Sequence, residues 1–345
     1  MQIKKNPSQA EWDLFINSLI TPVSFLQSWE YGELELLQKD KNLRLLVMDG
    51  KKPILAARFV EMPVPLFHKV RLYCPFGPIG DIDNSEAVKT LLNFVSDYTK
   101  NHKEILTVDF DLPFEREEQE QFGSFLDFID SFGYKKSEFT TLPRCTVVLE
   151  LTQTEEELWK ACKEKTRYNI NLARRKGVEI KIFEKPDWDV FWRIIEETTQ
   201  RQKVVIRSKK FFENFGKAFD YTKFLTVFGA YYQGELIATL FTVGYRDKAT
   251  YYYGGTSNSH RNTMANYLLQ WEVIKYLKNR GVKYYDLWGI VDGTEHTKGW
   301  EGITRFKRGF RGKEVEYVGF YRKVCQPLLY FTYLTTKKFR DRFLG

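Results

Sequence analysis

The sequence lacks the features that mark several common classes of protein. Its four cysteines lie far apart and form no Cys-x-x-Cys pair, which excludes a zinc knuckle and a thioredoxin-type redox site. The four histidines show no paired spacing, so no metal site is expected. No apolar run approaches the ~18 residues that a membrane helix needs, and the first residues contain no hydrophobic signal segment. We therefore expect a cytoplasmic protein that binds no metal.

Motifs for nucleotide binding and covalent catalysis are also missing. The sequence contains no Walker loop, no Gly-x-Gly-x-x-Gly turn, no nucleophile elbow and no Ser-His-Asp spacing. A covalent mechanism therefore has no obvious nucleophile. Acyl transfer by direct attack of an amine needs none, so this chemistry stays open.

The composition describes a globular protein with an excess of positive charge. The 345 residues are 43% hydrophobic and 28% charged, and this length predicts two domains. Lys and Arg number 53 against 45 acidic residues, which gives a net charge of +8. The excess is concentrated in residues 160–181, with eight basic and two acidic residues, and 304–345, with eleven and three. Such patches favour a polyanionic partner, either nucleic acid, a nucleotide-linked substrate or an anionic membrane.

An internal repeat organises the chain. Each half predicts two strands joined by a tight turn, then a strand, an amphipathic helix and a strand. The segments are 43–62, 70–81, 85–102 and 104–113 in the first half and 224–248, 249–259, 263–281 and 282–290 in the second. This order is that of the GNAT acyltransferase fold. We therefore predict an α+β protein of two tandem GNAT-like domains, each a mixed twisted sheet flanked by helices.

The remaining segments set the expected domain limits. Residues 155–177 predict one helix that begins with a Thr154–Glu157 capping box and ends at Gly177. The predicted domains are 1–150 and 151–314, and residues 315–345 could pack back on the first. Residues 328–345 combine apolar and basic residues at a spacing that suits an amphipathic helix on an anionic membrane.

The turn that would bind coenzyme A is altered in both halves. An enzyme of the GNAT fold that uses this donor needs a glycine-rich turn between strand and helix, where backbone N–H groups hold the pyrophosphate. In the second half this place is occupied by residues 259–266, SHRNTMAN, which contain no glycine. In the first half residues 80–85 add carboxylates. Both halves therefore argue against coenzyme A as the donor.

Six segments of the chain together carry a family resemblance, and they are FLQSWEYGEL (25–34), YCPFGPIGD (73–81), KEKTRYNINLARRKGVEI (163–180), YYYGGTSNS (251–259), NYLLQWEVIKYLKNRGVKYYDLWGI (266–290) and GITRFKRGF (302–310). In this order they resemble the FemABX family of peptidoglycan bridge-forming aminoacyltransferases, in its short form without a coiled-coil arm. The resemblance implies two GNAT-like domains. It also implies transfer of an amino acid from aminoacyl-tRNA to an amino group of a peptidoglycan precursor stem peptide, in cell-wall biogenesis.

The resemblance also implies roles for individual residues. Phe306 and Lys307 match a catalytic Phe-Lys pair, and the catalytic aspartate matches Asp111, or Asp109 if the alignment slips by two. Arg207 and Tyr253 match residues that bind the phosphate-bearing precursor. A second phosphate-binding residue, a lysine, falls on Glu35, which puts a UDP-linked precursor in doubt and leaves a lipid-linked one open. We expect the tRNA to contact basic residues of the two patches, namely Lys163, Lys165, Arg174, Arg175, Lys176, Arg305 and Arg308.

The sequence leaves other functions open. Within the same fold, the chain could be an N-acyltransferase with another donor, such as an acyl-CoA or an acyl carrier. From a different class, it could bind RNA or a wall precursor without catalysis. No cofactor is expected beyond aminoacyl-tRNA as co-substrate, and the general base is not settled by the sequence.

Overall fold

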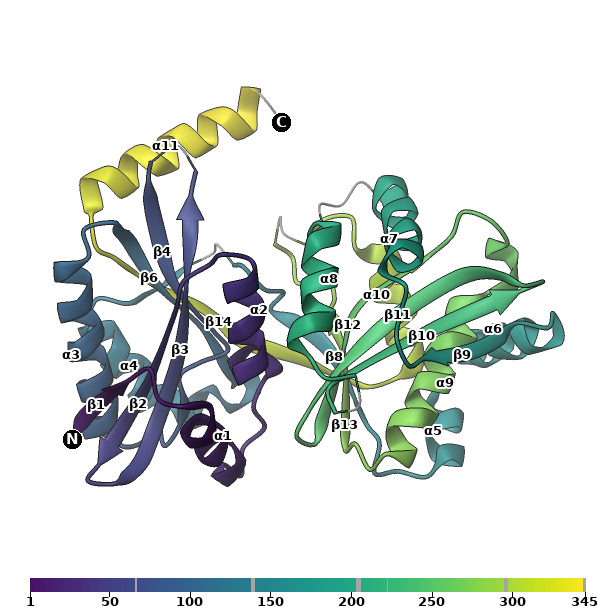
Figure 1. The fold of residues 1–345 in the computed structure, drawn as a ribbon, viewed down its shortest axis with the longest axis horizontal. Coiled ribbons are helices and arrows are strands. Elements are labelled where there is room, and N and C mark those ends of the chain that lie inside the picture. Colours follow the sequence, from purple (N-terminus) through teal and green to yellow (C-terminus); the bar gives the residue numbers. More distant parts are fainter. Residues whose placement is uncertain (66, 138–139, 203–205, 222, 295–296, 344–345) are drawn as a thin grey trace. The chain divides into compact units, whose positions relative to one another are not determined.

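The computed structural model describes residues 1–345 except 66, 138–139, 203–205, 222, 295–296 and 344–345. The chain folds into two compact units, residues 1–142 with 317–345 and residues 143–316 (Figure 1). The division between them falls after residue 142 rather than after residue 150. This is because the strand at 145–150 pairs with a strand of the second unit.

The first unit contains a mixed sheet with helices on both faces. Its elements are β1 (Gln2–Lys5), α1 (Gln9–Ser18), η1 (Phe25–Gln27), α2 (Trp29–Leu37), β2 (Asn42–Asp49), β3 (Lys52–Val64), β4 (Lys69–Pro75), β5 (Ile79–Gly80), α3 (Ser85–Asn101), β6 (Ile105–Glu115), η2 (Arg116–Phe122), α4 (Gly123–Ser131), β7 (Lys135–Ser137), the second part of β14 (Lys313–Val324) and α11 (Pro327–Phe343). The strand order is β1-β2-β3-β4-β6-β14, and β4 and β6 are parallel.

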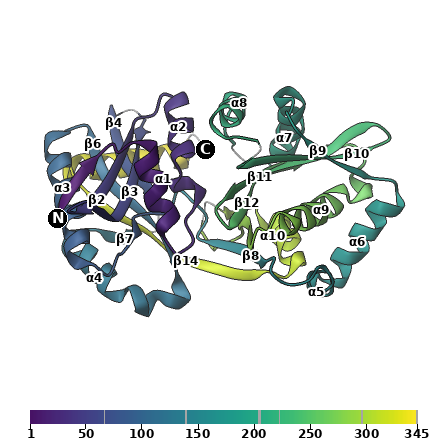
Figure 2. The ribbon, with the colours of Figure 1, turned by 60° about the horizontal axis from the view of Figure 1, so that its bottom comes forward.

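Side chains along the strands alternate between the two faces of the first sheet, and different helices cover each face. Leu43, Leu45 and Val47 of β2 point to the core that α3 and α4 cover. The opposite face carries α1, η1 and α2, whose Trp12 and Leu34 are fully buried (Figure 2). The helix α3 begins at the N-cap Asn84, whose side chain accepts a hydrogen bond from the backbone N–H of Ala87.

The second unit contains a second mixed sheet, in the order β14-β8-β13-β12-β11-β10-β9. Its elements are β8 (Cys145–Glu150), α5 (Glu155–Ala161), α6 (Glu164–Arg175), β9 (Glu179–Phe183), α7 (Trp188–Gln202), α8 (Lys209–Ala218), β10 (Leu225–Tyr232), β11 (Glu235–Tyr245), β12 (Lys248–Thr256), η3 (Arg261–Thr263), α9 (Ala265–Asn279), β13 (Tyr284–Gly289), α10 (Glu301–Lys307), η5 (Arg308–Phe310) and the first part of β14.

Helices cover both faces of the second sheet. One face is covered by α9 with α5 and α6, and its core includes Trp271 and Ile170 (Figure 2). The other face carries α7 and α8, whose Phe191, Phe212 and Phe215 pack on Phe241 of β11. Each of these large rings buries much apolar area, so the aromatic residues supply much of the core on this face.

The structure confirms the predicted repeat. The order β2-β3-β4-α3-β6 of the first unit recurs as β10-β11-β12-α9-β13 in the second, with the last two strands of each set parallel. The prediction of one helix over 155–177 is wrong. The helix is broken at Cys162 and Lys163, both extended, into α5 and α6.

Candidate active site

In the second unit, the parallel strands β12 and β13 separate beyond their first pairs. We call the place between the separated strands the wedge. β12 and β13 pair only over Lys248–Tyr284, Ala249–Tyr285 and Thr250–Asp286. Beyond these pairs β12 continues along β11, with a register shift between Tyr251 and Tyr253, and β13 continues along β8. The equivalent strands of the first unit, β4 and β6, stay paired as far as Pro75–Asp111. Bulges that redirect strands are common beside active sites, so the wedge is a candidate site.

Lys307 reaches into this wedge from α10. Its Nζ donates a hydrogen bond to the backbone oxygen of Gly289, at the end of β13, at 2.7 Å. The same nitrogen lies 5.6 Å from the ring centre of Tyr251 on β12. Lys307 therefore contacts both strands that form the wedge. Its neighbour Phe306 is buried and packs on Tyr267 of α9.

The surroundings of Lys307 lower the pKa of its amine. The side chain is buried, and burial lowers the pKa of its amine to about 7, although the carboxylate of Asp286 acts in the opposite direction. Asp286 itself pairs with Lys248 at 2.7 Å and accepts a hydrogen bond from the backbone N–H of Trp288. The Asp286 charge is thus already balanced, and Lys307 is a cation that can be neutralised near pH 7.

In the first unit, Asp111 and Asp109 point to the same face of β6 but have different partners. The Asp109 carboxylate receives two hydrogen bonds from the Arg322 guanidinium, at 2.6 and 2.9 Å, and lies 3.6 Å from Arg71. Asp111 instead accepts a hydrogen bond from the Tyr73 hydroxyl at 3.1 Å. Burial raises the pKa of the Asp111 carboxyl to about 7. The Asp111 carboxyl can therefore exchange a proton near neutral pH.

Arg207 and Tyr253 both neighbour one phenylalanine, Phe211, in the second unit. The Arg207 guanidinium lies 5.4 Å from the ring centre of Phe211, and the ring of Tyr253 lies 6.1 Å from the same ring. Arg207 is exposed just before α8. The two residues for which phosphate-precursor binding is expected are thus both neighbours of Phe211.

The first basic patch and the beginning of the second, residues 304–316, both belong to the second unit. The backbone N–H of Lys163, before α6, donates to the carbonyl of Gly309 in η5 at 2.9 Å. Six of the seven expected tRNA contacts are exposed on α6, α10 and η5, and Lys176 is half-buried. Arg174 pairs with Glu272, Arg308 pairs with Glu314, and Lys176 donates to the Asn262 carbonyl. The other four expected tRNA contacts are the exposed residues Lys163, Lys165, Arg175 and Arg305.

The turn that replaces the glycine-rich loop adopts a strained conformation without glycine. His260 and Met264 both have positive φ, 53° and 58°. This turn and the end of β12 line a cavity of about 370 Å³, which reaches Tyr267 beside Phe306. Non-glycine residues at positive φ carry Cβ atoms where a pyrophosphate loop requires bare backbone.

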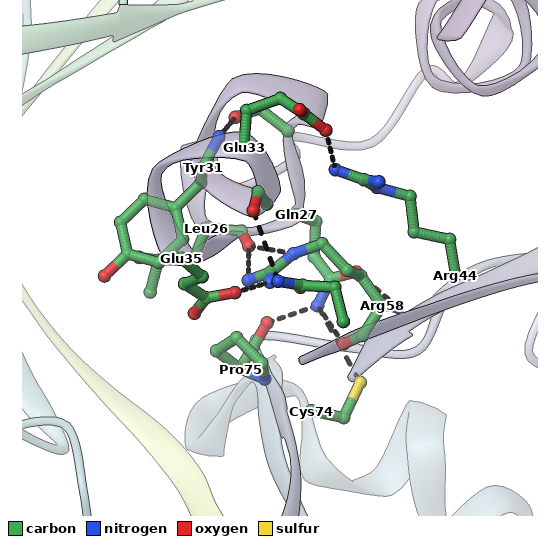
Figure 3. Close-up of polar contacts among 12 residues, drawn as sticks. Leu26, Gln27, Tyr31, Glu33, Glu35, Arg44, Arg58, Cys74 and Pro75 are labelled. Atoms are coloured by element: carbon green, nitrogen blue, oxygen red, sulfur yellow. Dashed lines mark hydrogen bonds and ion pairs between the residues drawn. The ribbon is translucent and has the colours of Figure 1, made fainter. Parts of the chain in front are cut away.

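Glu35 lies inside the first unit and binds an arginine. Arg58, which is fully buried, donates to the carboxylate of Glu35, to the Asn42 side chain at 2.7 Å and to the Leu26 carbonyl (Figure 3). Gln27 accepts from the Arg58 backbone N–H at 3.0 Å and donates to the Pro75 carbonyl. Glu35 therefore holds α2 and η1 against β3 and cannot be a surface phosphate ligand.

Sequence reasoning missed some residues of these sites. Tyr73 is the hydrogen-bond partner of Asp111, and Gly289 supplies the oxygen that holds Lys307. Both lie within segments that the resemblance covers, YCPFGPIGD and YDLWGI. No pattern distinguishes them from packing residues, because their partners lie 38 and 18 positions away in the chain.

Comparisons with known proteins agree with this architecture. A structure described as a tandem GNAT protein from the clavulanic acid biosynthesis pathway matches with a TM-score of 0.56 at 12% identity, over 94% of this chain and 99% of that one. The crystal structure of FemX matches with a TM-score of 0.82 at 17% identity, over 96% and 99%. The chain is thus a protein of two GNAT-like units.

The family follows from the sequence profile. The FemAB family matches residues 8–232 and 222–338, so the chain belongs to this family. The aminoacyltransferase FemA of Staphylococcus aureus is 22% identical over 417 aligned positions, which include 98% of this chain and 99% of FemA. Because 417 exceeds the 345 residues here, FemA carries residues that this chain lacks. In the described part of the chain, no helix is long and apolar enough to cross a bilayer.

Proposed function

We propose that this protein transfers an aminoacyl group from aminoacyl-tRNA to an amino group of a peptidoglycan precursor stem peptide. The observation that carries the proposal is Lys307, a buried cation held in the wedge of the second unit by the Gly289 carbonyl. Membership of the FemAB family and the likeness to FemA support the same reaction class.

The reaction needs positioning and charge stabilisation rather than a protein nucleophile. The acceptor amine attacks the ester carbonyl, a C–N bond forms, and negative charge develops on the carbonyl oxygen. The ammonium of Lys307 stabilises this oxyanion or the leaving ribose oxygen. The C–O ester bond then breaks, and the proton lost by the amine is balanced by the proton gained by the ribose hydroxyl. Asp111 is the candidate to accept the amine proton.

A tRNA donor accounts for two further features of the second unit. Exposed basic residues of α6 and η5 lie together next to the helix that carries Lys307. The turn at 257–267 has a cavity but no glycines, which disfavours a coenzyme A pyrophosphate. An adenosine-ended RNA has no pyrophosphate to bind there.

For the acceptor, we propose a lipid-linked precursor and contact with an anionic membrane through α11. Arg207 and Tyr253 are the proposed contacts to the phosphate-bearing part of the precursor. One side of α11 packs on the first unit, where Tyr333 contacts Phe67 and Arg322 donates to the Tyr330 hydroxyl at 2.9 Å. Leu328 and Phe331 remain 88% and 69% exposed. Exposed apolar groups on a helix rich in Lys and Arg suit the surface of an anionic leaflet.

A single assay tests the reaction. The protein is incubated with a mixture of charged tRNAs and either UDP-linked or lipid-linked pentapeptide, and products are identified by mass spectrometry. We expect a product heavier than the pentapeptide by one or more amino-acid residues, with the lipid-linked acceptor preferred. Treatment of the tRNA with RNase should abolish it. Product formation from acyl-CoA, or after RNase treatment, would instead show an N-acyltransferase with another donor.

A further inference from the structure

Exposed aromatic side chains are rare in this protein. The sequence contains 28 Phe, 20 Tyr and 8 Trp. Among those whose side chains the structure describes, only Tyr168 and Phe331 are exposed. Tyr168 lies on α6 with 56% of its surface exposed, in the middle of the basic segment.

The position of Tyr168 on α6 is opposite to the face that packs. The buried residues of this helix are Thr166, Asn169, Ile170 and Ala173. A helix turns by about 100° per residue, so Tyr168 and Arg175 share the outward face and Lys165 flanks them. Packing therefore gives no reason for an aromatic residue at this position.

Two cations accompany the ring along the helix. The Arg175 guanidinium lies 5.9 Å from the Tyr168 ring centre, within the range of a cation–π contact. Lys165 is exposed one turn before the ring. Arg175 comes ten positions after Lys165, which is about 15 Å along a helix. A flat ring between two cations combines a stacking surface with contacts for phosphates on either side.

The neighbourhood of α6 indicates which ligand would use this surface. The backbone N–H of Lys163 binds the Gly309 carbonyl, two residues beyond the end of the helix that carries Lys307. In the proposed reaction the ester of the donor must reach Lys307. The nucleotides next to that ester are then the part of the donor closest to α6. The acceptor end of a tRNA is single-stranded, so its bases are available for stacking.

We propose that Tyr168 stacks on an unpaired base of the RNA donor, while Lys165 and Arg175 contact the phosphates on its two sides. This inference rests on the proposed function, because it assumes that RNA carries the acyl group. It adds a residue that recognises single-stranded RNA through its bases, whereas the basic residues recognise only the backbone charge.

The test compares two RNAs and two substitutions. One RNA is a hairpin with a four-nucleotide single-stranded 3′ end, and the other is the same hairpin with a blunt end. For Tyr168→Ala we expect affinity for the overhanging RNA to fall about tenfold, in line with the loss of one base stack. Affinity for the blunt hairpin should not change. Tyr168→Phe keeps the ring and should bind as the wild type does.

Salt dependence separates stacking from charge. Tyr168→Ala should leave the slope of log affinity against log salt unchanged, whereas Lys165→Gln with Arg175→Gln should reduce its magnitude by about 1.4–1.8. Circular dichroism and thermal unfolding of each variant check that α6 is intact. Equal loss with both RNAs, or loss in Tyr168→Phe, would overturn the stacking role.

The same experiment distinguishes this inference from the proposed function. If the wild type forms product only with intact tRNA but Tyr168→Ala binds the overhanging RNA normally, the stacking inference is wrong and the function stands. If the wild type binds neither RNA and forms product after RNase treatment, both are wrong.

Discussion

A lysine buried in a protein interior is costly unless its environment supports it, and the Lys307 ammonium donates a hydrogen bond to the Gly289 carbonyl. Its pKa of about 7 lies far below the ~10.4 of a free lysine. At pH values between these two pKa values, the lysine is protonated in the unfolded chain and neutral in the folded one. The free energy of unfolding therefore rises with pH across this range. At pH 7 and below, the buried ammonium lowers stability.

Substitution of Lys307 should therefore separate activity from stability. For Lys307→Met we expect the rate to fall about 10²–10³-fold, because one charge at the developing oxyanion is lost. The unfolding temperature at pH 7 should equal or exceed that of the wild type, since no charge needs to be buried. The exposed Lys283→Met is the matched control and should alter neither. Wild-type turnover in Lys307→Met would exclude the catalytic role.

The pH dependence of the rate follows from two groups with pKa values near 7. The Asp111 carboxylate must be ionised to accept a proton, so the rate should rise with pH up to about 7. The Lys307 ammonium is lost as pH rises through about 7, so the rate should then fall. In Asp111→Asn the rising limb should move up to the pKa of the acceptor amine, and Lys307→Arg should remove the falling limb, because a guanidinium stays protonated. Profiles of kcat/KM identical to that of the wild type would refute both assignments.

At the residue scale, a short motif was enough to single out candidates. The run TRFKRGF marks Phe306 and Lys307, and the structure places Lys307 at the wedge and Phe306 against Tyr267, while their catalytic roles stay predictions. The choice between Asp109 and Asp111 could not be made from an alternating strand, because both point to one face. Arg322, 213 positions from Asp109, distinguishes them, and no local pattern reveals such a pair.

At the scale of elements, the break between α5 and α6 shows the same limit. The segment has good helix formers and no Pro or Gly at the break, so propensity predicts one helix. The structure instead uses the Lys163 N–H for the Gly309 carbonyl, and the Arg167 guanidinium donates to the carbonyls of Lys160 and Cys162. A tertiary contact thus overrides a local preference, and it joins the start of α6 to η5, at the beginning of the second basic patch.

The hydrogen bonds of Arg58 link α2 and η1 to the first sheet. Among the described residues, Glu35 is the only acidic side chain that contacts the Arg58 guanidinium. In Glu35→Lys two cations would meet in a buried position. We expect a loss of about 3–5 kcal/mol in the free energy of unfolding, measured with urea, as for other broken buried ion pairs. Glu35→Gln should lose less, because the amide oxygen still accepts a hydrogen bond.

The control for this experiment is a charge reversal at an exposed position. Asp97→Lys on α3 should change the free energy of unfolding by no more than about 0.5 kcal/mol. Unfolding of Glu35→Lys at the wild-type urea concentration would show that the ion pair contributes little. It would also reopen position 35 as a phosphate contact.

The helix α11 gives a prediction about membranes. In Leu328→Ser with Phe331→Ser, we expect loss of sedimentation with vesicles that contain anionic lipid, because both side chains are exposed and apolar. The unfolding temperature should not change, since neither residue is buried. The pair Leu36→Ser with Leu37→Ser removes two exposed leucines from α2 and serves as the matched control. Equal sedimentation of both double variants would assign the binding to another surface.

At the scale of the whole molecule, the two units share a fold but differ at the place where chemistry is possible. The paired strands β4 and β6 of the first unit leave no wedge, whereas β12 and β13 of the second unit separate. The repeat was predictable because strand and helix periodicities recur in order. The difference between the units was not, since the sequence of a strand does not show where its pairing with a distant strand ends. It depends on the register shifts around Tyr252 and Trp288, which only the paired backbones reveal.

The net charge of +8 belongs to the whole chain, and its distribution decides whether it acts on RNA. If α6 contacts phosphates, binding of tRNA must weaken steeply with salt, because each contact releases counterions. For Arg174→Glu with Arg175→Glu we expect a slope of log affinity against log salt that is smaller by about two. Arg174 already pairs with Glu272, so Arg175→Glu alone should cause the larger share. The control Lys51→Glu with Lys52→Glu changes the net charge equally, but at an exposed turn of the first unit. If it reduces the slope as much as the α6 pair does, binding depends on total charge and not on a defined face.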